Sequence, residues 1–170
     1  MKNFLILILI LFAFNSCQET PQTKFEMDGV SLTSPKGWKI TDEENLDDLG
    51  YYLSIEKDGL NSSGLITLSW VNGELDLNEW IDIYKDEMKN NIIYKNSNLT
   101  FGDEIKNKFN NLNTTSLEFT ASLLGLKHKG IIHFFYEKEK TFSLLMQEAI
   151  EDKAKNKTGF ELIERSLKIE

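Results

Sequence analysis

The segment Ile131–Tyr136 (IIHFFY) is apolar on both sides of an extended chain, and this decides the kind of sheet that the protein can form. Successive side chains of a β-strand point to opposite faces of the sheet, so such a strand needs a covering layer on each face. The segment therefore predicts a strand in the middle of a sheet. His133 lies on the same face as Ile131 and Phe135, which favours a histidine of the core over a metal ligand or general base.

Further strand patterns lie on both sides of this segment. Residues 116–123 alternate between apolar and polar side chains, which is typical of a half-buried strand. The predicted strands span residues 30–33, 38–41, 51–57, 65–71, 116–123, 131–136 and 141–147, with two short strands at 99–101 and 105–109. Polar turns such as Ser34-Pro35-Lys36-Gly37 join neighbouring strands, which favours an antiparallel sheet over a parallel βαβ arrangement.

Two helices are expected, and each has an apolar stripe at helical spacing. The stripe of the first consists of Leu77, Trp80, Ile81, Tyr84 and Met88. The stripe of the second consists of Phe160, Ile163 and Leu167. Asp76 with Glu79 is typical of the start of a helix, and Thr158 with Glu161 is expected to cap the second helix in the same way. The fold class is therefore α+β, with a mainly antiparallel sheet flanked by two helices.

The first residues of the chain have the pattern of a signal peptide. Lys2 precedes eleven apolar residues, Phe4–Phe14, which are about half the length of a membrane-spanning helix but suit a signal-peptide core. Cys17, the only cysteine, follows in the segment Phe14-Asn15-Ser16-Cys17, which resembles the lipobox of a bacterial lipoprotein. We expect cleavage before Cys17 and lipidation of that cysteine. An ordinary secretory signal followed by a free thiol is the alternative.

This interpretation divides the chain into three parts. Residues 1–16 are the signal peptide, residues 17–24 are the lipidated cysteine and a polar tether, and residues 25–170 form a single domain. The predicted location is the cell envelope, with the protein held by lipid to a bacterial membrane on its periplasmic or surface face. The membrane is thus one partner.

The charge of the chain restricts the other partners. The 19 basic residues face 27 acidic ones, for a net charge of −8, and Arg165 is the single arginine. An excess of negative charge argues against binding a nucleic acid, which needs a cationic surface. Anionic lipid repels a negative domain, so we expect the anchor rather than the domain surface to hold the protein at the membrane.

Three segments carry a resemblance to a known family. They are Val30–Lys39 (VSLTSPKGWK), with its Pro-x-Gly-Trp after a hydrophobic strand, the amphipathic helix around Trp80, and the closing segment Phe160–Leu167 (FELIERSL). Together they resemble the PsbP/Mog-type α/β/α sandwich, a group that includes the DcrB-like bacterial lipoproteins. Its members are mostly non-catalytic photosystem subunits, envelope lipoproteins, secretion chaperones and a Ran-binding protein. The resemblance therefore implies a binding or accessory protein.

The search for chemistry leaves Cys17 as the only named site. The sequence has no Gly-x-Ser-x-Gly turn and no glycine-rich phosphate loop, so we expect no catalytic residue, metal or cofactor. His128, in the cationic turn of residues 125–130, is expected to be solvated. A solvated acidic loop that suits a basic partner is expected from five carboxylates, those of Asp42, Glu43, Glu44, Asp47 and Asp48.

The large aromatic residues are assigned mainly to the core. Trp70 and Trp80 are expected to be buried, because large aromatic side chains dominate core packing. Trp38, just after a turn, is the best candidate for partial exposure. One ring of Tyr51 and Tyr52 should face outward, because the two are neighbours on a predicted strand.

The leading hypothesis is a non-catalytic, membrane-anchored envelope protein that binds another envelope protein as an accessory or assembly factor. It is expected to be a monomer. One alternative is a carrier of a small ligand or lipid in a cavity between sheet and helix. Another is an envelope immunity protein that blocks a secreted toxin. The partner or ligand, the binding residues and the membrane concerned are not specified by the sequence.

Overall fold

The computed structural model describes residues 19–59 and 62–170, and the predicted signal peptide and Cys17 lie outside these residues. Within them, a seven-stranded antiparallel sheet has the order β3-β4-β5-β9-β8-β7-β6. Its strands are β3 (Trp38–Asn45), β4 (Gly50–Lys57), β5 (Leu65–Asn72), β6 (Thr100–Phe109), β7 (Leu112–Leu123), β8 (Leu126–Glu137) and β9 (Lys140–Ala149). The expectation of a mainly antiparallel sheet is confirmed.

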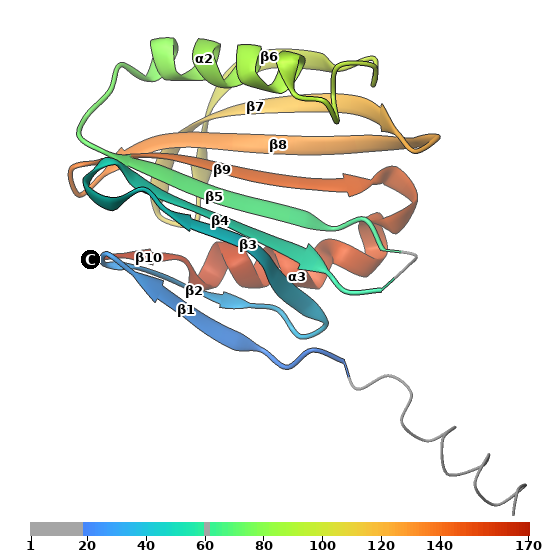
Figure 1. Cartoon of the computed structure of the whole chain (residues 1–170), viewed down its shortest axis with the longest axis horizontal. Helices are drawn as coiled ribbons and strands as arrows, with labels where there is room; N and C mark the ends of the chain where they lie inside the picture. The colour runs from blue at the N-terminus through green and yellow to red at the C-terminus, as the bar shows by residue number, and fades with distance from the viewer. Residues whose placement is uncertain (1–18, 60–61) are drawn as a thin grey trace, which may run out of the picture.

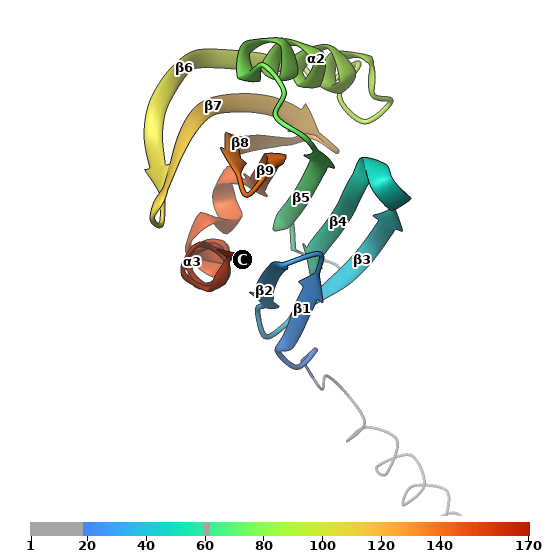
Figure 2. The ribbon, with the colours of Figure 1, turned by 90° about the vertical axis from the view of Figure 1, so that its left-hand side faces the viewer.

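Two helices and a small sheet cover the faces of this large sheet (Figure 1). Helix α2 (Leu77–Asn90) lies on one face. The other face carries α3 (Lys153–Ser166) and a three-stranded sheet of β1 (Thr23–Met27), β2 (Val30–Ser34) and β10 (Lys168–Ile169). Figure 2 shows the large sheet curving around the α3 side, with β6 and β7 bent over it. The α+β class with two helices is confirmed.

The segment Ile131–Tyr136 lies in β8, between β7 and β9, as its double apolar pattern predicts. Ile132 and Phe134 belong to the core beneath α2, whereas Phe135 belongs to the core on the α3 side. Burial of each such side chain contributes about 1.5–3 kcal/mol to the free energy of unfolding. A strand of this composition is therefore stable only between two layers.

The start of α2 also follows the sequence prediction. The Asp76 carboxylate accepts hydrogen bonds from the backbone N–H groups of Asn78 (2.8 Å) and Glu79 (3.2 Å). Asp76 thereby satisfies two donors that the first turn of a helix leaves unpaired. Trp80, one turn further, donates from Nε1 to Ser143 Oγ on β9 at 2.7 Å and fixes the helix to the sheet.

The predicted start of the second helix is wrong. Helix α3 begins at Lys153, after the short 3-10 helix η2 (Ile150–Asp152), so Thr158 and Glu161 lie inside the helix and do not cap it. The buried residues of its first two turns are Asn156 and Gly159. An apolar stripe cannot be recognised there because these buried positions are not hydrophobic.

Two further boundaries differ from expectation. The two short strands expected at 99–101 and 105–109 are one strand, β6, with an irregular register between Phe101 and Glu104. At the beginning of the domain, β1 starts at Thr23, and the backbone N–H of Gly37 donates to the carbonyl oxygen of Thr20 at 2.7 Å. Residues assigned to the tether therefore contact the domain, because they add a strand to β2.

The other short helical segment is η1 (Asp47–Leu49), between β3 and β4. No helix in the two described stretches of the chain is long and apolar enough to cross a membrane.

Candidate functional site

A groove of about 680 Å³ opens between α3 and two turns that precede and follow strands of the large sheet. The turns are Pro35–Gly37, between β2 and β3, and Asp58–Gly59, after β4. Its lining includes four basic side chains, those of Lys36, Lys57, Lys155 and Arg165. Only two acidic residues, Glu19 and Asp58, line it, although acidic residues outnumber basic ones in the chain.

Trp38 forms the floor of this groove and is 2% exposed. The expectation that Trp38 is partly exposed is therefore wrong. A Cβ atom at Gly159 of α3 would lie 2.7 Å from the indole, and one at Gly64 would clash with the same ring. Two glycines from distant parts of the chain thus allow α3 and the β4–β5 loop to close over the tryptophan.

Lys57 is the most constrained cation of the groove. Its Nζ donates to the backbone carbonyl oxygen of Lys155 at 2.6 Å and to Asn156 Oδ1 at 3.2 Å, and both acceptors are neutral. Lys36 and Lys155, by contrast, form ion pairs with Glu19 (2.9 Å) and Asp152 (2.6 Å). Within residues 19–59 and 62–170, no carboxylate forms an ion pair with Lys57 or Arg165.

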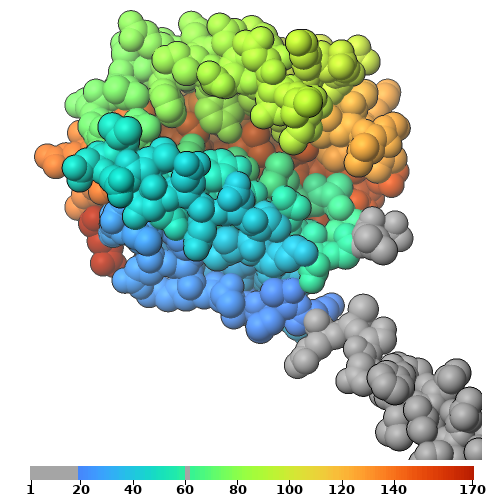
Figure 3. Space-filling view, viewed as in Figure 1, coloured from blue at the N-terminus to red at the C-terminus, as the bar shows by residue number. Residues whose placement is uncertain are grey.

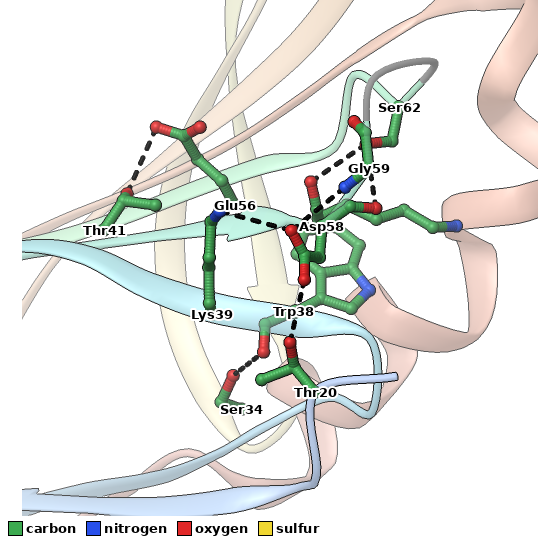
Figure 4. A network of polar contacts seen from close by, with 10 residues as sticks. Thr20, Ser34, Trp38, Lys39, Thr41, Glu56, Asp58, Gly59 and Ser62 are labelled. Carbon is green, nitrogen blue, oxygen red and sulfur yellow. Dashed lines mark hydrogen bonds and ion pairs between the residues drawn. The ribbon is translucent and has the colours of Figure 1, made fainter. Parts of the chain in front are cut away.

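Asp58 joins three groups at the edge of the groove by hydrogen bonds, as Figure 4 shows. Its carboxylate accepts from Lys39 Nζ (3.2 Å), Thr20 Oγ1 (3.0 Å) and the backbone N–H of Gly59 (3.1 Å). The hydrogen bond from Lys39, followed by that from Thr20, lowers the pKa of Asp58. The beginning of the described chain is therefore fixed to the rim of the groove.

One face of α3 gives the groove its length. Lys155, Thr158, Gly159, Leu162 and Arg165 line it, at the spacing of successive helical turns. Lys155 and Arg165 are ten residues apart, which corresponds to about 15 Å along a helix. Positive charges therefore lie towards both ends of an elongated site with an aromatic floor. Such a shape suits an extended anionic chain. No group of histidine, cysteine and acidic residues in the described part of the chain could hold a metal ion.

Solved structures of other proteins share this architecture. LpqN of Mycobacterium tuberculosis, described as involved in cell envelope biogenesis, matches with a TM-score of 0.53 and 15% identity over 94% of this chain and 96% of its own. The cyanobacterial PsbP protein CyanoP of Synechocystis matches with a TM-score of 0.58 and 11% identity over 88% and 92% of the two chains. The fold is PsbP-like. No protein-family model and no curated protein sequence matches the chain.

The predicted PsbP-type fold is thus confirmed. In this fold the two histidines lie on opposite faces of the large sheet. His133 is buried on the α3 side, where Nδ1 lies 3.2 Å from Thr114 Oγ1 and the ring packs on Phe109. Burial lowers the pKa of His133 to about 4. His128, five residues earlier on β8, faces the α2 side, because an odd separation along a strand reverses the face.

The expectation of a solvated His128 is wrong. The side chain is buried, and its Nδ1 lies 3.4 Å from Gln147 Nε2 on the neighbouring strand β9. Burial lowers its pKa. The turn consists of Leu124 and Gly125 and is shorter than expected. Strand β8 begins at Leu126, so His128 lies in the sheet.

The five acidic residues occupy an edge strand as well as a loop. Asp42, Glu43 and Glu44 lie on β3, an edge of the large sheet, and Asp47 and Asp48 lie in η1. All five are exposed. Charged side chains on an edge strand discourage pairing with another chain.

Of the remaining aromatic predictions, that of Trp70 is confirmed, and those of Trp80 and of the Tyr51–Tyr52 pair hold only in part. Trp70 is buried and stacks on Tyr51 with ring centroids 5.0 Å apart. Trp80 is half-buried and contributes to the core beneath α2, and the ring of Tyr52, beside the buried Tyr51, is also half-buried. No motif in the sequence marks the residues of the groove as a site. The spacing from Lys155 to Arg165 was a visible signal, but Lys57 and Trp38 join that face only in three dimensions.

Proposed function

We propose that this protein is a lipid-anchored accessory protein of the bacterial cell envelope that binds an acidic, extended segment of another envelope protein in the groove beside α3. It acts by binding and not by catalysis. The observation that carries the proposal is the pair of cations, Lys57 and Arg165, that line the groove without an ion-pair partner among the described residues.

The charge of the groove supports this partner. Lys57 is half-buried, and among the described residues its ammonium group donates to one carbonyl and one amide oxygen. A carboxylate of a bound segment would supply the opposite charge, and charge-assisted hydrogen bonds are shorter and stronger than neutral ones. The rest of the protein is acidic and repels the same partner, so the segment is directed to this groove.

The dimensions of the groove support an extended segment. A length of about 15 Å accommodates four or five residues of an extended chain. Trp38 and Leu162 provide apolar contacts between the charges. An acidic peptide with an apolar residue near its centre would satisfy both features.

The position of the groove supports action at a membrane. Glu19 lines it, and Cys17, the predicted lipidation site, is two residues earlier in the sequence. Two extended residues span at most about 7 Å. The PsbP-like fold is shared with LpqN, a protein involved in cell envelope biogenesis. These features support a partner among proteins of the same envelope.

Recovery of partners from native membranes tests the proposal. The intact lipoprotein is purified by affinity from its own membranes, in parallel with Cys17→Ala, Arg165→Glu and Lys168→Glu variants. Lys168 is an exposed residue of β10 outside the groove, so its reversal is the matched charge control. We expect one partner to be recovered with the wild type and Lys168→Glu, and to be lost with Arg165→Glu and Cys17→Ala.

The recovered partner should also compete with a synthetic acidic peptide from its own sequence. Retention of the partner by Arg165→Glu would exclude the groove as the binding site. Recovery of no partner by folded, lipidated protein would contradict the accessory function as a whole.

A second candidate function, carriage of an apolar ligand, is favoured by one specific cavity. It has a volume of about 270 Å³ and lies between the large sheet and α3, where Ile131, Met146 and Phe160 line it. Burial raises the pKa of Glu148 at its edge. Native mass spectrometry of the purified domain would detect a co-purifying lipid, and an empty cavity in every preparation would count against a carrier.

A further inference from the structure

The loops at one end of the large sheet form a surface that adjoins the groove and shares part of its rim, including Glu19 and the Pro35–Gly37 turn. This surface, the Glu19 end, comprises residues 19–22, the Pro35–Gly37 turn, the described parts of the β4–β5 loop, the α2–β6 loop, the Leu124–Gly125 turn and η2. Hydrogen bonds from backbone N–H groups join several of these segments to their neighbours. Gly37 N–H donates to Thr20 O, Ser122 N–H donates to Ser97 O, and Ala149 N–H donates to Ser63 Oγ at 2.8 Å.

Aliphatic side chains project from this end. Ile92 is 89% exposed, Ile93 is 62% exposed, Ile150 is 53% exposed, and Leu124 is fully exposed. The α2–β6 loop, the β7–β8 turn and η2 lie at the right-hand end in Figure 1, and the first two form the right-hand edge of the surface in Figure 3. Water-exposed aliphatic groups from three separate loops are unfavourable unless another apolar phase receives them.

A leucine at position 124 is unfavourable for the stability of the folded domain. It occupies the first position of the two-residue β7–β8 turn with a φ of 51°, a conformation that favours glycine, asparagine or aspartate. The other two-residue hairpins of the described chain have polar first residues, Asp28, Asn110 and Lys138. A leucine at this strained, fully exposed position indicates a role outside the folded domain.

Lysines accompany these aliphatic residues. Lys95 follows Ile93 by two positions, Lys127 lies three positions after Leu124, and Lys153 lies three positions after Ile150. All three lysines are exposed. Four acidic residues, Glu19, Asp58, Glu151 and Asp152, lie in the same segments, so this end is close to neutral although the protein is acidic. Exposed aliphatic side chains with neighbouring lysines, and without an excess of negative charge, suit a surface that inserts into the headgroup region of a membrane.

We infer that the Glu19 end docks on the surface of a lipid bilayer, with Leu124, Ile92 and Ile93 inserted among the lipid headgroups. The bilayer is the occupant because Cys17 lies two residues before Glu19, so an acyl chain on it starts beside this end. The inference rests on the proposed lipidation of Cys17. It gives the domain a fixed orientation at the membrane, whereas the net charge of −8 by itself predicts that lipid repels the domain surface.

A dye at a single introduced cysteine tests the docking. Leu124→Cys is compared with Leu49→Cys, because Leu49 is 73% exposed and lies in η1 at the opposite end of the sheet. The lipidated proteins are reconstituted into vesicles of phosphatidylethanolamine and phosphatidylglycerol and labelled with an environment-sensitive fluorophore. We expect a blue shift and at least twofold stronger quenching by spin-labelled lipid at position 124 than at position 49.

The number of dyes per chain separates the two hypotheses. One dye per chain means that the Cys17 thiol is blocked, whereas two dyes would overturn the lipidation. With one dye per chain, equal quenching at positions 124 and 49 would overturn the docking. In lipidated protein, an additional Ile92→Ser and Ile93→Ser substitution should lower the docked-to-undocked ratio at position 124 by about tenfold or more. An unchanged ratio would contradict the inference.

Discussion

The two ends of the seven-stranded sheet differ in charge, although both expose aliphatic side chains. The Glu19 end places Leu124, Ile93 and Ile150 beside lysines and is close to neutral. Its four acidic residues, Glu19, Asp58, Glu151 and Asp152, are balanced by Lys36 and Lys95 together with Lys127 and Lys153 at the adjoining starts of β8 and α3. The opposite end, which we call the Asp47 end, comprises η1, the β5–α2 loop and the β1–β2, β6–β7 and β8–β9 turns. Its acidic residues in these segments are Asp28, Asp47, Asp48, Glu74, Asp76 and Glu139, and its only lysine there is Lys138.

This difference shows that a net charge of −8 conceals a polarised molecule. Leu49 and Leu75 at the Asp47 end stand among carboxylates, which an anionic lipid surface repels. The Glu19 end, where lysines balance the acidic residues, is not repelled in this way. In the proposed orientation, the domain faces the membrane with the Glu19 end and presents acidic residues to the envelope space with the Asp47 end.

The largest difference between the two ends is expected in the free energy of unfolding, when the floor of the groove is removed. Trp38→Ala should lower the free energy of unfolding by about 3–5 kcal/mol, because a fully buried tryptophan is removed. Leu49→Ala, at the Asp47 end, should change it by no more than about 0.5 kcal/mol, because the side chain is exposed. Urea unfolding followed by circular dichroism measures both. Equal losses would mean that the groove is not built on a rigid floor.

Acidification is expected to lower the free energy of unfolding through the buried His133, which lies in the interior of the domain. The pKa of His133 is lowered to about 4 in the folded protein, against 6.5 in the unfolded chain, because burial disfavours the charged ring. The unfolded chain therefore binds the extra proton between these values, and stability present above pH 6.5 is lost as the pH falls towards 4. The loss from this residue should reach roughly 3 kcal/mol.

Comparison with a His133→Gln variant isolates this contribution from that of the surface carboxylates. The difference in unfolding free energy between the two proteins should change with pH over the range between the two pKa values. Parallel pH profiles would show that His133 titrates normally in the folded state. The lowered pKa of His128 acts in the same direction in both proteins, so it does not affect the difference.

The smallest expected effects are changes in the docked-to-undocked ratio when single lysines near the Glu19 end are reversed in charge. Lys127→Glu and Lys153→Glu should each lower the docked-to-undocked ratio at position 124 roughly fivefold or more, since one lysine near an anionic membrane contributes about 1 kcal/mol. Lys138→Glu, at the Asp47 end, is the matched control and should leave the ratio unchanged. Quenching by spin-labelled lipid measures all three. An equal response to reversal at both ends would remove the proposed orientation.

Local patterns allowed much of the fold to be predicted from the sequence. The double apolar pattern of Ile131–Tyr136 correctly predicted a central strand, and Asp76 caps α2 as its position indicates. The PsbP-type resemblance, carried by short segments around Trp38, Trp80 and Ile163, is confirmed for the fold by CyanoP. Each of these signals depends on residues close together in the chain.

The errors have a common physical origin. Trp38 is buried because Gly64 and Gly159 leave room for its ring, and His128 is buried because β9 pairs beside it. The start of α3 was missed because Asn156 and Gly159, rather than apolar residues, face the interior. In each case the deciding neighbour is far away in the sequence or is not hydrophobic.

The amino-acid sequence by itself determined the strand periodicity, the antiparallel connections, the first helix and the pattern that predicts lipidation at Cys17. These properties depend on the alternation of side chains and on local turn and cap geometry. The tertiary structure alone decided the groove and the polarity of the two ends. Lys57, Lys155 and Arg165 converge, and Ile92, Leu124 and Ile150 reach one end, because strand register and helix packing bring distant segments together.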